Sequence, residues 1–262
     1  MNKTTTYTKL EAQLVKYRDL VGVTVDESND PFVELPDRLP GDYGAIGRYQ
    51  ALGDMKETFP QVPVRKSIKE KLDRADKKLK TINPSLQLVV AYGFRSLEVQ
   101  QNYFELIRAQ VIQDKNRDED LDEIVHRQIA VPAVAGHPTG GAVDVFIQDS
   151  QTGSMLEFGT SLFDFDSKDV YVFSPFISET AKKNRALLRE ILLDEEFAPY
   201  DGEWWHFSFG DKEWAFYYKK PFALFEQKSE KYVAFNLNVE TKMSKGSDVN
   251  GGDSTSLAFS FN

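Results

Sequence analysis

The sequence predicts an α+β fold in which a small antiparallel sheet is flanked by helices. Two apolar runs, at residues 86–92 and 142–147, have the length and composition of buried strands. Three longer stretches, at residues 64–80, 97–113 and 178–194, space their apolar residues with the period of a helix. At 262 residues the chain is long enough for one large domain or two small ones.

Composition excludes several classes of function. The formal net charge of −9 argues against nucleic acid as the main partner, because phosphate binding needs clustered Lys and Arg. No apolar run is long enough for a membrane span, so we expect no membrane insertion. Residues 1–20 are polar and lack the apolar core of a secretion signal, so we expect a cytoplasmic protein. The oligomeric state stays open.

The chain contains no cysteine. This excludes thiol nucleophiles, disulfides and thiolate metal sites together. Any zinc would therefore have to be held by His, Asp or Glu side chains.

The first 63 residues are expected to form a helix and an irregular wrapping segment. Apolar residues recur with helical spacing over residues 7–20, whereas residues 30–63 are rich in proline and glycine. The helix expected at residues 64–80 then begins the central part of the chain, and its lysine-rich side is interpreted as a solvated face.

The central part, residues 64–227, holds the remaining expected elements. The strand at residues 86–92 runs into Arg95, and Ser96 and Ser178 are expected to cap the helices that follow them. Residues 114–125 are expected to be an exposed loop or helix end, and His126 beside them is interpreted as a surface or capping histidine. In the extension at 228–262, alternating stretches at 233–239 and 257–261 predict two strands joined by a loop at 244–255, a possible edge hairpin.

Two histidine-containing segments carry the chemistry. His137 and Asp144 are separated by a Gly-Gly pair, and imidazole nitrogen and carboxylate oxygen are both good zinc ligands. On a straight strand an offset of seven would place these side chains on opposite faces, so the glycines would have to bend the chain. Considered alone, His137 is more typical of a structural or surface role than of metal ligation.

The second segment is Glu203-Trp204-Trp205-His206. Alternation predicts a strand on which Trp204, His206 and Ser208 share one face, and a turn frees the direction of Glu203. His206 is then a candidate third ligand and Glu203 a general base and acid, with tryptophans that exclude water. The alternative is an aromatic core beside a solvated Glu203. With only three histidines in the chain, two beside acidic residues, the metal interpretation is favoured.

Arg95 is the candidate for stabilising the oxyanion of a tetrahedral intermediate, because it follows a buried strand. A surface salt bridge is the alternative.

Together these residues resemble the zinc D-alanyl-D-alanine dipeptidases. His137, Gly140, Ala142 and Asp144 match the family's first pattern, and Glu203 and His206 match its Glu-x-x-His pattern. Segments around Arg95, at 159–164 and at 184–188 are also similar, and the likeness covers about residues 64–225.

The resemblance implies one Zn²⁺ per chain, bound by His137, Asp144 and His206, with Glu203 as general base and acid. It implies Arg95 as transition-state stabiliser and Asp164 as the residue that holds the substrate's ammonium group. The expected activity is hydrolysis of D-Ala-D-Ala, or a similar short peptide, by metal-activated water. Ala135, Gly136 and Thr139 depart from the family pattern on the expected substrate side, which leaves the D-Ala-D-Ala preference open.

Two alternatives stay open. One is a D,D-carboxypeptidase or L,D-endopeptidase that acts on longer peptidoglycan peptides and needs an open groove. The other is a non-catalytic binding module with a structural zinc ion. Such a module would need neither Glu203 nor Arg95.

Overall fold

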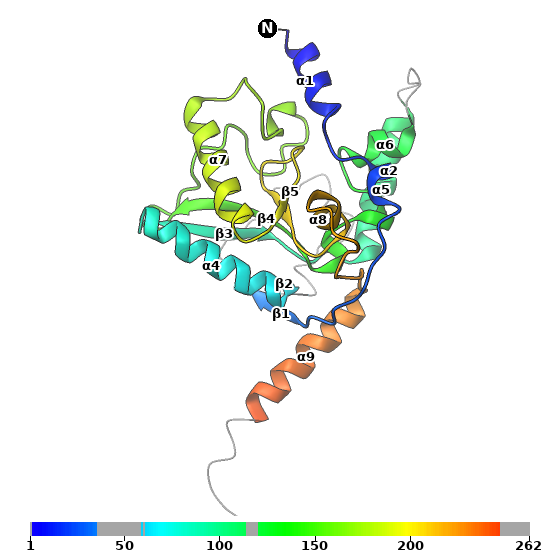
Figure 1. The fold of residues 1–262 in the computed structure, drawn as a ribbon, viewed down its shortest axis with the longest axis vertical. Coiled ribbons are helices and arrows are strands. Elements are labelled where there is room, and N and C mark those ends of the chain that lie inside the picture. Colours follow the sequence, from blue (N-terminus) through cyan, green and yellow to red (C-terminus); the bar gives the residue numbers. More distant parts are fainter. Residues whose placement is uncertain (1, 36–58, 60, 114–119, 247–262) are drawn as a thin grey trace, which may run out of the picture.

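The structure is a computed structural model that describes residues 2–35, 59, 61–113 and 120–246 (Figure 1). Its centre is an antiparallel sheet with the strand order β3-β4-β6-β5. These strands are β3 (Leu86–Tyr92), β4 (Ala142–Asp149), β6 (His206–Ser208) and β5 (Ala198–Pro199). A second sheet pairs β1 (Phe32–Leu35) with β2 (Val62–Arg65). Small antiparallel sheets with flanking helices confirm the α+β prediction.

Helices flank the central sheet, except for α9 (Glu230–Gly246), which extends away from it (Figure 1). The other described helices are α1 (Lys3–Glu11), α2 (Tyr17–Leu20), α4 (Lys66–Ile82), α5 (Leu97–Ile112), α6 (Leu121–His126), α7 (Glu179–Leu193) and α8 (Lys212–Tyr217), with short 3₁₀ turns η3 (Pro132–Val134), η4 (His137–Thr139) and η5 (Lys168–Val170). Helix α4 packs against β3, α7 packs against β4 and β5, and the two helices contact each other. Within the described part of the chain, no helix has the length and apolar character that crossing a bilayer requires.

The predicted caps of α5 and α7 are confirmed. The Ser96 hydroxyl accepts a hydrogen bond from the Val99 N–H, and the Ser178 hydroxyl accepts one from the Ala181 N–H. Each bond satisfies a donor that the first helical turn leaves without an intrahelical partner. Both helices therefore begin where their serines indicate.

Strand β4 separates the core from the site. Val143, Val145 and Ile147 are fully buried in the main hydrophobic cluster, together with Ile68 of α4. Because side chains alternate along a strand, Asp144 lies on the opposite face. A one-residue slip would push this carboxylate into the apolar core, so the hydrophobic pattern fixes the register. In that register Asp144 pairs with Tyr92 of β3 and with His206 of β6.

The N-terminal prediction of one helix over residues 7–20 is wrong, because two short helices occupy this stretch. The Glu123 carboxylate of α6 accepts hydrogen bonds from the backbone N–H groups of Tyr17 and Arg18, at 3.0 Å each. These bonds start a new helix at Tyr17. Asp19 also caps this helix locally by accepting from the Lys16 N–H at 3.2 Å, but the contact with Glu123, over a hundred residues away, leaves no local signal.

The irregular segment predicted for residues 30–63 is corrected at both of its ends. Residues 32–35 form β1 and pair with β2, which begins at Val62. Residues 36–58 and 60 lie outside the described residues.

The C-terminal strand predicted at 233–239 is wrong, because this segment belongs to helix α9. Val233 is buried, whereas Phe235 is 69% exposed. An apolar pair four residues apart, such as Val233 and Leu237, fits one face of a helix as well as one face of a strand. The predicted loop at 244–255 begins inside α9. Its remainder, and the predicted strand at 257–261, lie outside the described residues.

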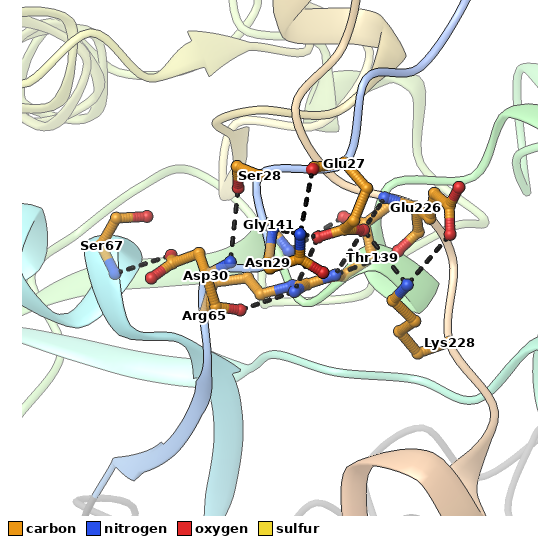
Figure 2. Close-up of polar contacts among 10 residues, drawn as sticks. All are labelled: Glu27, Ser28, Asn29, Asp30, Arg65, Ser67, Thr139, Gly141, Glu226 and Lys228. Carbon is orange, nitrogen blue, oxygen red and sulfur yellow. Dashed lines mark hydrogen bonds and ion pairs between the residues drawn. The ribbon is translucent and has the colours of Figure 1, made fainter. Parts of the chain in front are cut away.

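A buried arginine connects the N-terminal segment to the turn that carries His137 (Figure 2). Arg65, at the end of β2, is 1% exposed. Its Nε donates to the Thr139 carbonyl at 2.8 Å, and its Nη1 donates to the Asp30 carbonyl at 2.6 Å. The guanidinium also pairs with Glu27 and donates to the Glu226 carbonyl. One cation therefore links three chain segments behind η4.

Candidate active site

Three elements bring the predicted metal ligands together. His137 begins η4, Asp144 lies in β4, and His206 begins β6. The two carboxylate oxygens of Asp144 lie 3.5 Å from His137 Nε2 and 3.0 Å from His206 Nδ1. One ligand atom from each residue falls within 4.8 Å of the others. The widely separated sequence segments thus converge at one point.

The chain bends before β4 as the glycine pair predicts. Turn η4 ends at Gly140, which has a φ of +74°. A Cβ at Gly140 would lie 2.3 Å from the Phe32 ring, and a Cβ at Gly136 would lie 2.1 Å from Asp211 Oδ2. The backbone can therefore follow this path only with glycine at both positions.

The His137 ring is oriented by the strand beside it. Its Nδ1 lies 2.7 Å from the Gly93 carbonyl oxygen, which only an N–H can satisfy. The proton is therefore on Nδ1, and the lone pair of Nε2 points to Asp144. Such a hydrogen bond from the outer nitrogen is the usual way in which a metal-binding histidine is held.

The charges at these three residues suit a cation. Burial lowers the pKa of His137, so its ring is neutral. Burial would raise the pKa of Asp144, but the two imidazoles hold it well below its usual range. Burial would also lower the pKa of His206, but its hydrogen bond to Asp144 and the charge of that carboxylate raise it to about 9. Asp144 thus remains anionic between the two rings, and His206 would release its proton on binding a metal ion.

This donor set fits zinc. Tetrahedral coordination with bond lengths near 2.1 Å places ligand atoms about 3.4 Å apart. The two nitrogen–oxygen distances of 3.5 and 3.0 Å lie on either side of that value. Two histidines and one carboxylate also leave a fourth coordination position open, which is typical of catalytic zinc sites.

A cavity with about 70 Å³ of open interior volume adjoins the three residues. The polar and aromatic side chains on its wall, besides the three ligands, include Arg95, His126, Phe163, Phe165, Tyr200, Glu203, Trp205 and Glu213. The structure thus places Glu203 and Arg95 beside the ligands. Asp164 is half-buried and is not among the residues that line this cavity, although both of its neighbours are.

Glu203 lies in the turn before β6, where its N–H donates to the Tyr200 carbonyl. Burial raises the pKa of its carboxyl to about 7, and the opposing charge of His206 only partly offsets this effect. A carboxyl that titrates near neutral pH can both accept and return a proton.

Arg95 faces the cavity from the end of β3. Its Nη1 donates to Gln100 Oε1 at 2.9 Å, and its guanidinium carbon lies 4.9 Å from the ring centroid of Tyr92 and 5.0 Å from that of Tyr103. Its Nε is buried and has no hydrogen-bond partner. Among the described residues no carboxylate forms an ion pair with it, so they provide no support for the salt-bridge alternative.

Two predictions about aromatic residues near the site are wrong. The strand begins at His206 and not at Trp204, so Trp204 does not share its face. Trp204 stacks on Phe158 in the core, with ring centroids 4.1 Å apart, while Trp205 lines the cavity. His126 is buried rather than a surface residue: it lines the cavity, and its Nδ1 accepts a hydrogen bond from the Val131 N–H at 3.3 Å.

The three departures from the family pattern have separate consequences. Ala135 and Gly136 line the cavity as expected. Thr139 does not, because its hydroxyl donates to the Gly136 carbonyl and accepts from the Gly141 N–H. Thr139 therefore stabilises the η4 turn.

Sequence reasoning missed Tyr200 and Glu213 on the cavity wall. Neither lies in a recognisable motif. Asp211, which caps α8 through a bond from the Trp214 N–H, was the available local signal for the helix that carries Glu213.

The chain is similar in sequence to known peptidases. A peptidase M15 family model, described as D-Ala-D-Ala dipeptidase, matches residues 58–228. The D-alanyl-D-alanine dipeptidase of Synechocystis sp. is 25% identical over 205 residues, which are 69% of this chain and 80% of that protein. The corresponding enzymes of Escherichia coli and Enterococcus faecium are 30% and 32% identical over 80 and 82 residues. These shorter matches cover 30% and 31% of this chain and 40% of each relative.

Solved structures show weaker similarity. VanYB in complex with D-alanine-D-alanine is 17% identical, with a TM-score of 0.38, and the match covers 62% of this chain and 80% of that one. The LdcB LD-carboxypeptidase is also 17% identical, with a TM-score of 0.40 and 71% coverage of both chains.

Proposed function

This chain belongs to the peptidase M15 family of D-Ala-D-Ala dipeptidases, and from this premise we propose that it is a zinc-dependent dipeptidase. Its proposed substrate is D-Ala-D-Ala or a similarly short D-amino-acid peptide. The observation that carries the proposal is the convergence of His137, Asp144 and His206 next to a cavity that also holds Glu203 and Arg95. A purely structural zinc site would need neither of the last two.

In this proposal His137 Nε2, an Asp144 oxygen and His206 Nδ1 hold the ion. When bound, zinc supplies Lewis-acid chemistry, since it polarises a carbonyl group and lowers the pKa of water. Glu203 takes the proton of the attacking water and then delivers it to the leaving amine. Arg95 directs its guanidinium at the negative charge that develops on the carbonyl oxygen. Trp205 excludes bulk water and so strengthens both electrostatic contributions.

A second candidate activity is hydrolysis of longer peptidoglycan peptides. It is favoured by a neighbouring cavity of about 510 Å³, lined in part by Glu11, Arg127 and Lys168. This cavity shares Gln128, Phe165 and Glu203 with the smaller one. A peptide that continues beyond the scissile bond could extend into it.

The decisive experiment combines metal analysis with kinetics. Purified protein should contain about one zinc ion per chain, as one ligand set implies. Glu203→Ala should keep that zinc and lose roughly 10²–10⁴ in kcat, the contribution typical of general acid–base catalysis. Glu70→Ala, at an exposed position of α4, is the matched control and should behave as wild type.

Comparing D-Ala-D-Ala with a stem pentapeptide separates the two candidate activities. A higher kcat/KM for the dipeptide supports the dipeptidase. A higher value for the pentapeptide supports the second candidate. Zinc-loaded wild-type protein that cleaves neither would contradict both and favour a binding module.

A further inference from the structure

The cavity contains a carboxylate that the proposed mechanism does not use. Glu213 lies in the first turn of α8 and lines the cavity wall together with His206 and Glu203. Its Oε1 is buried without a hydrogen-bond partner, and no ion pair of Glu213 occurs among the described residues. A buried carboxylate in this state is costly, because it has lost water without gaining a donor.

Among the described residues, no lysine or arginine is a principal charge acting on Glu213. The principal charges that act on Glu213 are those of His206, Asp211, Glu203 and Asp201, and three of these are carboxylates. His206 would be neutral as a metal ligand. Consistent with this, burial raises the pKa of Glu213 to about 8. Arg95, the one lysine or arginine among the described lining residues, is not among these charges.

A second polar group in the same cavity is also without a partner. Tyr200 is 8% exposed, and its hydroxyl makes no hydrogen bond. The Tyr200 ring lies edge-on to His206, with centroids 6.2 Å apart. Burial raises the pKa of Tyr200 well above its usual range, and the charges of Glu203 and Glu213 add to this effect. Glu213 and Tyr200 each have an unsatisfied side-chain oxygen and both line this cavity, which suits a ligand with several N–H donors.

We propose that Glu213, assisted by the Tyr200 hydroxyl, binds the free α-ammonium group of the peptide substrate. This inference rests on the proposed dipeptidase function and assigns a specificity residue within it. A primary ammonium carries three donors and a positive charge, so it can satisfy both groups at once. Glu213 thereby takes the role that the family resemblance implied for Asp164, which is not on the cavity wall.

The test compares two ligands that differ only in this group. N-acetyl-D-Ala-D-Ala lacks the ammonium of D-Ala-D-Ala but keeps the rest of the peptide. We expect Glu213→Gln to raise KM for D-Ala-D-Ala by about 10–100-fold, the effect of losing a charged hydrogen bond. The inhibition constant of N-acetyl-D-Ala-D-Ala should stay the same or fall. Tyr200→Phe should also raise the ratio of the KM for D-Ala-D-Ala to the inhibition constant of N-acetyl-D-Ala-D-Ala, by a smaller factor than Glu213→Gln.

Other roles give different results. If Glu213 merely positioned His206 or stabilised α8, Glu213→Gln would weaken both ligands equally or reduce the bound zinc, and the inference would be overturned. An unchanged KM, or a shift seen in Asp164→Asn but not in Glu213→Gln, would overturn it as well. Failure of zinc-loaded wild type to cleave D-Ala-D-Ala would instead refute the proposed function. Glu70→Gln controls for the loss of one acidic charge.

Discussion

Arg95 is a buried cation for which the described residues provide no carboxylate ion pair, which suits a catalytic role better than a stabilising one. Its guanidinium is buried against two tyrosine rings, one amide partner holds it, and its Nε remains free. This arrangement fixes the direction of the cation, as the oxyanion role proposed for it requires. A flexible ammonium could not reproduce the planar fork.

We therefore expect Arg95→Lys to lower kcat by roughly 10²–10³, as removal of an oxyanion donor does. Zinc content should not change, because Arg95 is not a ligand. Steady-state kinetics with metal analysis measures both quantities. Arg74→Lys, at the exposed ion pair with Glu195, is the matched control. A loss confined to KM would show that Arg95 binds the ground state instead.

At the residue scale, the sequence could predict those site residues whose chemistry and spacing are distinctive. Two histidine segments beside acidic residues, in a chain with only three histidines, predict a candidate metal centre before the fold is known. Tyr200 and Glu213 give no such signal. They reach the cavity only because β5, β6 and α8 fold against one another, and their missing partners become visible only in three dimensions.

The η4 turn is the element on which the ligand geometry depends. Gly140 combines a positive φ with close packing against Phe32, whereas Gly153 has a similar φ of +71° and no heavy atom within 4 Å of the point that a Cβ would occupy. Alanine at position 140 should therefore suffer both backbone strain and a steric clash, whereas alanine at position 153 should suffer backbone strain alone. At position 140 both effects act on the turn that presents His137.

We expect Gly140→Ala to lower the free energy of unfolding by more than Gly153→Ala does. The backbone component should cost both variants about 1–3 kcal/mol. Only Gly140→Ala should also reduce zinc affinity, since relieving its clash moves His137. Urea denaturation and zinc titration provide the measurements. Equal zinc affinity in both variants would show that the turn tolerates the displacement.

Arg65 holds the same turn from behind (Figure 2). We expect Arg65→Gln to cost about 3–5 kcal/mol of unfolding free energy, because it breaks a buried ion pair together with the hydrogen bonds to three backbone carbonyls, and leaves Glu27 with Lys228 as its cation. Chemical denaturation tests this, with the exposed i,i+4 pair of Lys69 as control. Lys69→Gln should cost less than about 0.5 kcal/mol. Similar costs at both positions would mean that solvent reaches the Arg65 cluster.

Elements were predictable where local sequence and tertiary packing agree. The strand at residues 86–92 coincides with β3, and the serine caps locate the starts of α5 and α7. The predictions for the two ends of the chain were wrong for two physical reasons. Glu123 starts α2 from a distant helix. In α9, the spacing of the apolar residues is compatible with both a helix and a strand, and only the packing in the folded structure selects the helix.

At the scale of the whole molecule, the three ligands connect η4, β4 and β6, so a bound ion should stabilise the entire fold. Ligand binding to the native state alone contributes about 4 kcal/mol when the free ligand is at about 1,000 times its Kd. We therefore expect chelation to lower the Tm, and zinc to restore it. Calorimetry with and without chelator measures the shift. Asp144→Ala should abolish the response to zinc, and a zinc-dependent Tm in that variant would contradict the assigned ligand set.

The buried state of His126 should make the whole fold sensitive to acid. Burial lowers the pKa of this imidazole from 6.5 to about 4 in the folded protein. Because the unfolded chain binds the proton more readily, His126 stabilises the fold fully above pH 6.5, and this contribution is lost as the pH falls toward 4. The loss between pH 7.5 and 5 should be about 2 kcal/mol.

His126→Gln removes the titrating group and keeps a side chain that can accept the hydrogen bond from Val131. Urea denaturation of both proteins at pH 7.5 and 5, with chelator present, isolates this contribution, since the other titrating groups are common to both. We expect the unfolding free energy of the wild type to fall by about 2 kcal/mol more than that of the variant. Parallel losses would mean that water reaches the imidazole from the cavity.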